Sequence, residues 1–219
     1  REVGRTADFI PAATALAAAL PGDPERVLPP EQRWWSSRST VESALVVDLL
    51  TALSLLDRGL AERAVDHLLA WPKTYGLDAV IVPAALTLTE RASAAGGAAV
   101  QRLRDAALAH LNARIAEPLE PPHNWTRASV IACRCADCAE LSRFLADPER
   151  KTWTFKAAEP KRRHLAESIQ RNACDVDGAT ERSGRPYGLV CTKNRASYEK
   201  RALQRKKDLK DQALLAAAD

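Results

Sequence analysis

The sequence lacks the features that would place a chain in a membrane or in the secretory pathway. No stretch of it approaches the roughly 18 uncharged apolar residues of a membrane-spanning helix. Residues 1–5 hold no apolar run followed by a small-residue cleavage site, so no secretory signal is visible. Methionine is absent, even at position 1, which is most simply explained if the 219 residues are a segment of a longer polypeptide. We therefore expect an intracellular protein, cytoplasmic or nuclear, that contacts no membrane and whose activity lies upstream of this chain.

Common catalytic motifs are also missing. The sequence contains no H-x-D, H-x-E or H-E-x-x-H pattern, which excludes a facial iron triad and a zinc-protease site within it. It has neither a glycine-rich phosphate loop nor a G-x-S-x-G nucleophile elbow. We therefore predict no catalytic residue and no cofactor-binding residue in this chain, although a longer parent protein can still be an enzyme.

What is present is the composition of a globular protein with two parts. The apolar fraction (46%) and the charged fraction (27%) are ordinary, and the length suffices for one large domain or two small ones. Pro118, Pro121 and Pro122 interrupt the pattern. We predict a scaffold of helical hairpins at residues 1–120 and a small α+β module at residues 121–219.

Residues 1–120 have the pattern of successive helices. Leucines at three- and four-residue spacing run through residues 41–56, and a second apolar stripe begins at Leu60. Gly59, between the two, predicts a turn with a positive φ. Further helices are expected at residues 6–20, at residues 98–116, and at residues 78–92, where Pro83 implies a kink or a late start. Short connections favour antiparallel hairpins, so this mainly α part is either a short α-solenoid or an irregular bundle.

The pattern changes after the prolines. The α+β module is predicted to contain two short strands, because residues 152–155 and 187–192 are rich in aromatic and β-branched side chains. Helices are expected between and around them, at residues 136–146, 159–173 and 195–217. The last of these is a long, charged C-terminal helix.

Positive charge is concentrated toward the end of the chain. Residues 150–219 carry 17 Lys and Arg against 9 Asp and Glu, a net charge of +8, whereas residues 1–149 have a net charge of −4. A basic module of this kind can meet nucleic acid or an acidic protein surface, and it can also be only a solvated face. The residues that would contact nucleic acid lie at the start of one helix and along the last one: Arg162, Arg163, Arg201, Arg205, Lys206 and Lys207.

Three of the five cysteines fall within six residues, at Cys133, Cys135 and Cys138. A C-x-x-C spacing lets one turn of backbone present two thiolates to a tetrahedral ion, and the first cysteine adds a third sulfur. The fourth ligand is expected to be His164, with Cys174 as the alternative. Either set is typical of structural zinc, and a closed site with four protein ligands leaves no position for a substrate.

Two other interpretations of the cysteines remain open from the sequence. Cys138 can be a buried apolar residue at the start of a helix while the other two are exposed. A redox site is the third possibility: Arg134 would favour a thiolate there, but the expected strand–helix context is not evident. Cys191 lies in an apolar run and is predicted to be a core residue.

Residues 130–200 hold a further set of motifs around the cysteine cluster: Ala136 and Asp137, Leu141, Phe144–Pro148, Arg163–Leu165, Thr180–Arg182, Gly184, Pro186, Leu189–Lys193 and Tyr198. With these motifs the segment resembles the C-terminal region of large fungal and bacterial proteins described as 2-oxoglutarate/Fe(II) oxygenase-like. It implies that Fe(II) and 2-oxoglutarate bind an upstream catalytic domain, and that this chain is a non-catalytic region which binds a protein partner or that domain. The cysteines and His164 occupy motif positions, which favours a structural metal site. The alternative function is a self-standing nucleic-acid-binding module that uses the basic C-terminal helix.

Overall fold

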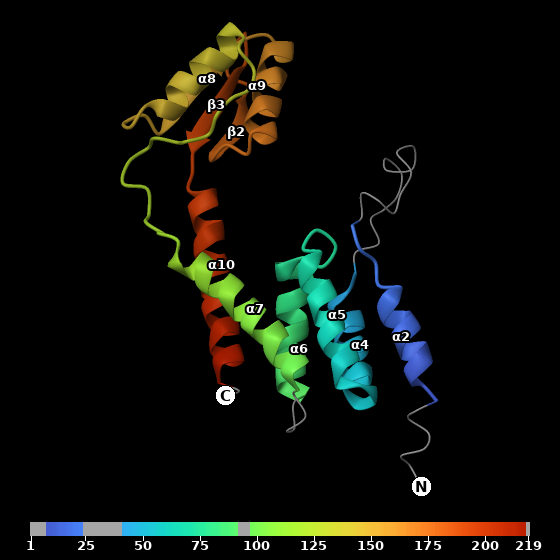
Figure 1. Ribbon diagram of the computed structural model, residues 1–219. Coiled ribbons are helices and arrows are strands. Elements are labelled where there is room, and N and C mark those ends of the chain that lie inside the picture. Colours follow the sequence, from blue (N-terminus) through green and yellow to red (C-terminus); the bar gives the residue numbers. More distant parts are fainter. Residues whose placement is uncertain (1–7, 24–40, 92–96, 218–219) are drawn as a thin grey trace. The chain divides into compact units, whose positions relative to one another are not determined.

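The computed structural model describes residues 8–23, 41–91 and 97–217 (Figure 1). They form a mainly helical protein with a small three-stranded antiparallel sheet and a long C-terminal helix, which confirms the predicted fold class. The chain divides into two compact units. We call residues 1–117 with residues 206–219 the helical unit, and residues 118–205 the sheet unit.

The helical unit follows the predicted succession of helices closely. Its elements are α2 (Ile10–Ala18), α4 (Ser43–Leu56), α5 (Arg58–Ala70), the π-helical turn η2 (Leu77–Ile81), α6 (Val82–Arg91) and α7 (Ala98–Ala116). Pro83 is the second residue of α6, where its missing N–H is not needed inside that helix. The helix therefore starts late, as this proline predicts, and η2 precedes α6.

The turn between α4 and α5 differs from the prediction at Gly59. This glycine lies inside the first turn of α5, and the chain reverses at Asp57 instead, whose backbone is extended. Asp57 caps α5, because its side chain accepts a hydrogen bond from the backbone N–H of Leu60 at 3.0 Å. The two helices are therefore joined at an N-cap aspartate and not at the predicted glycine with positive φ.

The helices of this unit share one core. Val46, Leu50 and Leu53 of α4 are fully buried together with Leu68 of α5 and Leu103 of α7. α4 packs against α5, α6 and η2, and α5 packs against α7. Contacts between alternate helices occur in stacked helical hairpins as well as in a bundle, so both predicted arrangements agree with this packing.

The long helix α10 (Ala196–Ala216) is divided between the units, which differs from the predicted domain at residues 121–219. Its last part, from Lys206 onward, belongs to the helical unit, where Leu215 joins the core and Asp208 is buried. Arg114 of α7 donates two hydrogen bonds to the Asp208 carboxylate, at 2.6 and 2.7 Å. The sequence did not predict this buried face, because most residues of the helix are charged or polar.

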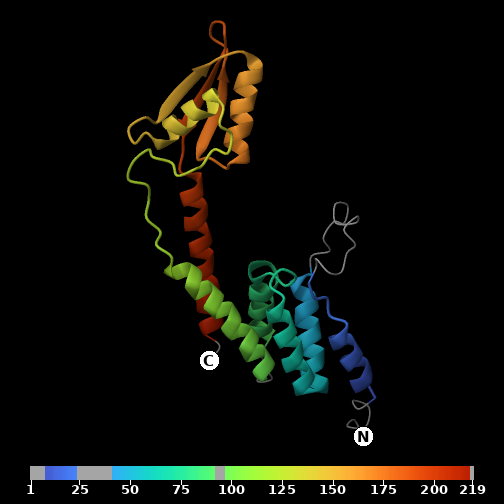
Figure 2. The same ribbon diagram turned by 45° about the horizontal axis from the view of Figure 1, so that its top comes forward.

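The sheet unit contains β1 (Thr152–Lys156), β2 (Val176–Glu181) and β3 (Gly188–Lys193), in the order β1-β3-β2, with α8 (Ala136–Ala146) and α9 (Glu159–Arg171). Both helices cover the same face of the sheet (Figures 1 and 2). β2 was not predicted from the sequence. It is an edge strand in which weak β-formers (Asp, Gly, Ala and Glu) outnumber Val176 and Thr180, and only Val176 is buried, so it lacks the usual alternation of a strand.

The core of the sheet unit lies between the two helices and the sheet. Trp153 and Phe155 of β1 pair with Cys191 and Leu189 of β3, and all four side chains face the helices. Phe144 of α8 packs on Trp153, with ring centroids 5.5 Å apart. The aromatic residues of β1 are therefore core, and Cys191 is fully buried as predicted.

Candidate metal centre

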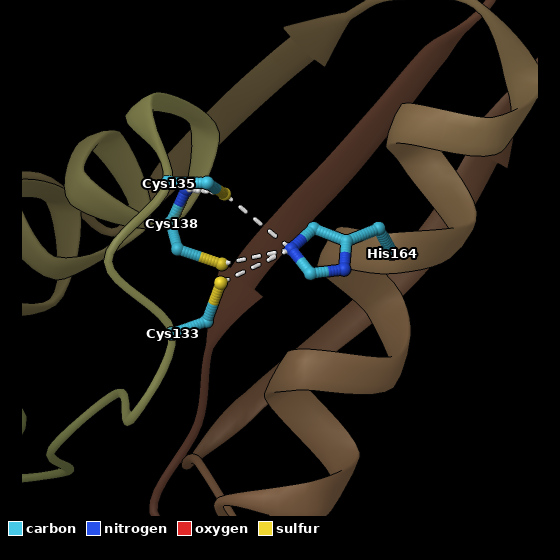
Figure 3. Close-up of side chains that lie close together, drawn as sticks. All are labelled: Cys133, Cys135, Cys138 and His164. Carbon is cyan, nitrogen blue, oxygen red and sulfur yellow. Dashed lines mark hydrogen bonds between the residues drawn. The ribbon is translucent and has the colours of Figure 1, made fainter.

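The first helical turn of α8 places two of the three clustered sulfurs. Cys135 is the N-cap of α8, and its sulfur lies 3.5 Å from the backbone N–H of Cys138, which it accepts as a hydrogen bond. Because the N-cap and the third helical residue lie on the same side of the first turn, both sulfurs point the same way. Cys133 adds its sulfur from the extended segment that leads into the helix (Figure 3).

The fourth donor comes from α9. His164 directs its Nε2 at all three sulfurs, at 3.5 Å from Cys133, 3.4 Å from Cys135 and 3.4 Å from Cys138 (Figure 3). The four ligand atoms all lie within 4.8 Å of one another. A tetrahedral zinc ion, with Zn–S of about 2.3 Å and Zn–N of about 2.0 Å, holds sulfur and nitrogen about 3.5 Å apart. The donor set and its spacing can therefore hold such an ion.

Packing fixes the direction of the imidazole. Leu165 and Ile169 are buried against the sheet and so set the rotation of α9 about its axis, which leaves His164 facing the start of α8. Lys161, one turn earlier, lies 3.6 Å from the carboxylate of Asp137 in the first turn of α8. Contacts outside the donor set therefore hold the two helix starts together.

Ser168 is a supporting residue that the sequence interpretation missed. It lies one turn after His164, donates a hydrogen bond from Oγ to the His164 carbonyl at 2.9 Å, and has its Oγ 3.5 Å from the Cys138 sulfur. Outer partners of this kind orient ligands and tune a metal. The four-residue spacing from His164 on one helix face was the signal that could have revealed it.

The three thiols differ in acidity. The pKa of Cys135 is lowered to about 7, chiefly because its sulfur accepts the N–H of Cys138 at the positive end of a helix. Burial raises the pKa of Cys138 to about 11. Cys135 is thus partly ionised at neutral pH, while the fully buried Cys138 needs a nearby cation to lose its proton.

The remaining cysteines lie outside this group. Cys174, the alternative fourth ligand, follows α9 and is not among the residues whose donor atoms come together. Its thiol is hydrogen-bonded to Ser129, and burial raises its pKa. Burial also raises the pKa of Cys191 to about 11. All five cysteines are free thiols.

The basic residues of the nucleic-acid prediction are divided between the two units. Arg162 is half-buried with its guanidinium over the Tyr187 ring, 5.4 Å from the centroid, and Arg163 is exposed. On α10, Arg201 and Arg205 belong to the sheet unit, whereas the next two cations belong to the helical unit. These last two are Lys206, which is exposed, and Lys207, which forms an ion pair with Asp211 at 3.1 Å.

Comparison with known proteins gives no family assignment. No known protein family, curated protein or solved structure matches the chain. Among the helices of the described ranges, none has the length and apolar character to span a membrane.

Proposed function

We propose that Cys133, Cys135, Cys138 and His164 bind one zinc ion whose role is structural. The observation that carries this proposal is the convergence of one imidazole nitrogen and three sulfurs at the spacing of tetrahedral ligands. Thiolates select soft or borderline ions, and three of them with one imidazole are a common structural zinc set.

A closed coordination sphere explains why the ion stabilises and does not catalyse. Four protein ligands leave no open position for water or substrate. The ligands come from the segment before α8, from the first turn of α8 and from α9. An ion bound there fastens three parts of the sheet unit that otherwise meet through a core of only ten buried side chains among the described residues.

In the wider protein, the chain acts as a non-catalytic scaffold and interaction region. The resemblance of residues 130–200 to the C-terminal region of 2-oxoglutarate/Fe(II) oxygenase-like proteins supports a place beside an upstream domain that binds Fe(II) and 2-oxoglutarate. The parent sequence tests this part of the proposal. An upstream H-x-D with a distal His and Arg supports it, and a parent without such a set contradicts it.

Elemental analysis of the purified chain tests the zinc site. We expect close to one zinc per chain in the wild type and in Cys174→Ser, which changes a cysteine outside the donor group. His164→Ala should fall below about half an equivalent, whereas His123→Ala should not, because that side chain is 83% exposed and is not one of the four donors. Equal zinc in the two histidine variants would contradict the assignment.

A further inference from the structure

A second group of side chains in the sheet unit surrounds Trp125. Three cations lie near its indole ring: Lys151 at 4.9 Å, Arg127 at 5.3 Å and Arg195 at 5.8 Å from the ring centroid. They come from separate segments, since Arg127 precedes α8, Lys151 precedes β1 and Arg195 follows β3. We call Trp125 and these three cations the indole–cation cluster.

Hydrogen bonds hold the backbone segment that carries the indole. The backbone N–H of Trp125 donates to the Pro148 carbonyl at 2.9 Å, and the backbone N–H of Arg127 donates to the Leu145 carbonyl at 2.8 Å. These bonds attach the segment to the end of α8 and to the turn after it. A segment whose backbone is ordered before a ligand arrives loses little conformational freedom on binding.

Arg127 is the buried member of the cluster, and one of its hydrogen-bond donors is unsatisfied. It is 6% exposed, and its guanidinium donates from Nε to the Asn194 carbonyl and from Nη1 to the carbonyls of Asn124 and Thr126. Its Nη2 is buried and has no hydrogen-bond partner. An unsatisfied buried donor is costly, so a site that supplies an acceptor nearby is favoured.

Positive charge at the cluster is only partly neutralised. Lys151 and Arg195 are exposed, and among the described residues neither forms an ion pair. Burial and the charge of Arg195 both lower the pKa of Arg127, while Asp175 raises it. The Asp175 carboxylate, however, already accepts hydrogen bonds from the backbone N–H and the hydroxyl of Ser197.

Two further groups near the cluster do not change this balance. Lys193 is buried, with its Nζ donating to the Asp147 carbonyl at 2.6 Å. The Asp147 carboxylate accepts the backbone N–H groups of Glu149 and Arg150. The whole sheet unit has 17 Lys and Arg against 11 Asp and Glu, a net charge of +6. The surroundings therefore favour an anionic ligand.

We propose that the indole–cation cluster binds single-stranded nucleic acid. An unpaired base stacks on the half-buried indole in place of one of the exposed cations, and the neighbouring phosphates contact Lys151 and Arg195. An aromatic face bordered by cations suits this ligand, because stacking accepts any base and the cations follow the backbone. A duplex does not fit as well, because its bases are already stacked on one another.

Arg195 directly precedes α10, and charge-matched variants distinguish the cluster from the cations of that helix. We would measure binding of a labelled single-stranded oligonucleotide to the full chain by fluorescence anisotropy, from about 25 to 200 mM salt. We would compare two double variants that change the net charge equally. One combines Lys151→Glu with Arg195→Glu, and the other combines Lys200→Glu with Arg201→Glu. All four side chains are exposed, so thermal melting should show both proteins folded.

The expected result is a loss confined to the cluster. The Lys151/Arg195 double variant should bind at least about tenfold more weakly, and the Lys200/Arg201 variant within about twofold of the wild type. Trp125→Ala should cost about fivefold or more, with Trp125→Phe retaining most of the affinity because it keeps an aromatic face. The salt slope of the wild type should be about −1.4, as two single-strand phosphate contacts require.

Three outcomes would overturn the proposal. One is the absence of binding to the wild type even at the lowest salt. Another is an equal or larger loss in the Lys200/Arg201 variant, which would move the contact to α10. The third is competition by an acidic peptide as effective as by unlabelled oligonucleotide, which would indicate a protein ligand. If Trp125→Ala fails to fold, the two charge-matched variants still decide.

Discussion

Removing the zinc ion should unfold the sheet unit and leave the helical unit folded. Among the described residues, the sheet unit has ten buried core side chains, against 23 in the helical unit, so it depends more on a bound ion. With free zinc at about a thousand times its dissociation constant, binding adds about 4 kcal/mol to the free energy of unfolding. For a unit of this length each kcal/mol shifts the melting temperature by about 4–8 °C, so we expect a shift of about 15–30 °C.

Hydrogen exchange followed by mass spectrometry reads the two units separately. After chelation we expect amide protection to be lost in α8 and α9 and to persist in α4, α5 and α7. His164→Ala should reproduce this pattern without chelator, and His123→Ala, an exposed histidine of the same unit, should not. Unchanged protection in α8 and α9 of a chain shown to be free of zinc would refute the reasoning.

Two other predictions concern zinc affinity and the helical unit. Cys138, with a pKa of about 11, must lose its proton to bind zinc, so the apparent zinc affinity should fall at least about tenfold for each unit by which the pH decreases. The fall should be steeper below pH 7, where Cys135 is also protonated. Competition with a chromophoric chelator measures this slope, and a flat profile would contradict the prediction. Arg114→Ala should lower the free energy of unfolding by about 3 kcal/mol in urea denaturation, because Asp208, at 1% exposure, loses its bidentate partner. Arg102→Ala, which breaks an exposed pair, is the matched control and should cost less than about 1 kcal/mol; equal losses in the two variants would show that burial of the pair is irrelevant.

Local patterns in the sequence predicted most of the elements. The helix expected at residues 136–146 is α8 to the residue, and the strands expected at residues 152–155 and 187–192 correspond to β1 and β3. β2 was missed because an edge strand with one buried side chain carries no strand pattern of its own. Its existence depends on pairing with β3, which is a tertiary property.

The candidate site was also only partly predictable. Residue types and spacing pointed to Cys133, Cys135 and Cys138, but they left the fourth ligand open between His164 and Cys174. The structure brings the histidine to the sulfurs because the buried side chains of α9 set the orientation of that helix. The indole–cation cluster had no local signal, since three segments far apart in the sequence form it.

X-ray absorption at the zinc edge of the purified chain tests the central claim most directly. We predict a four-coordinate ion with three sulfurs at about 2.3 Å and one nitrogen at about 2.0 Å. His164→Ala should either lose the zinc or show a spectrum without the scattering contribution of an imidazole ligand. A shell with fewer than three sulfurs, or a wild-type chain that binds no zinc under reducing conditions, would contradict the account.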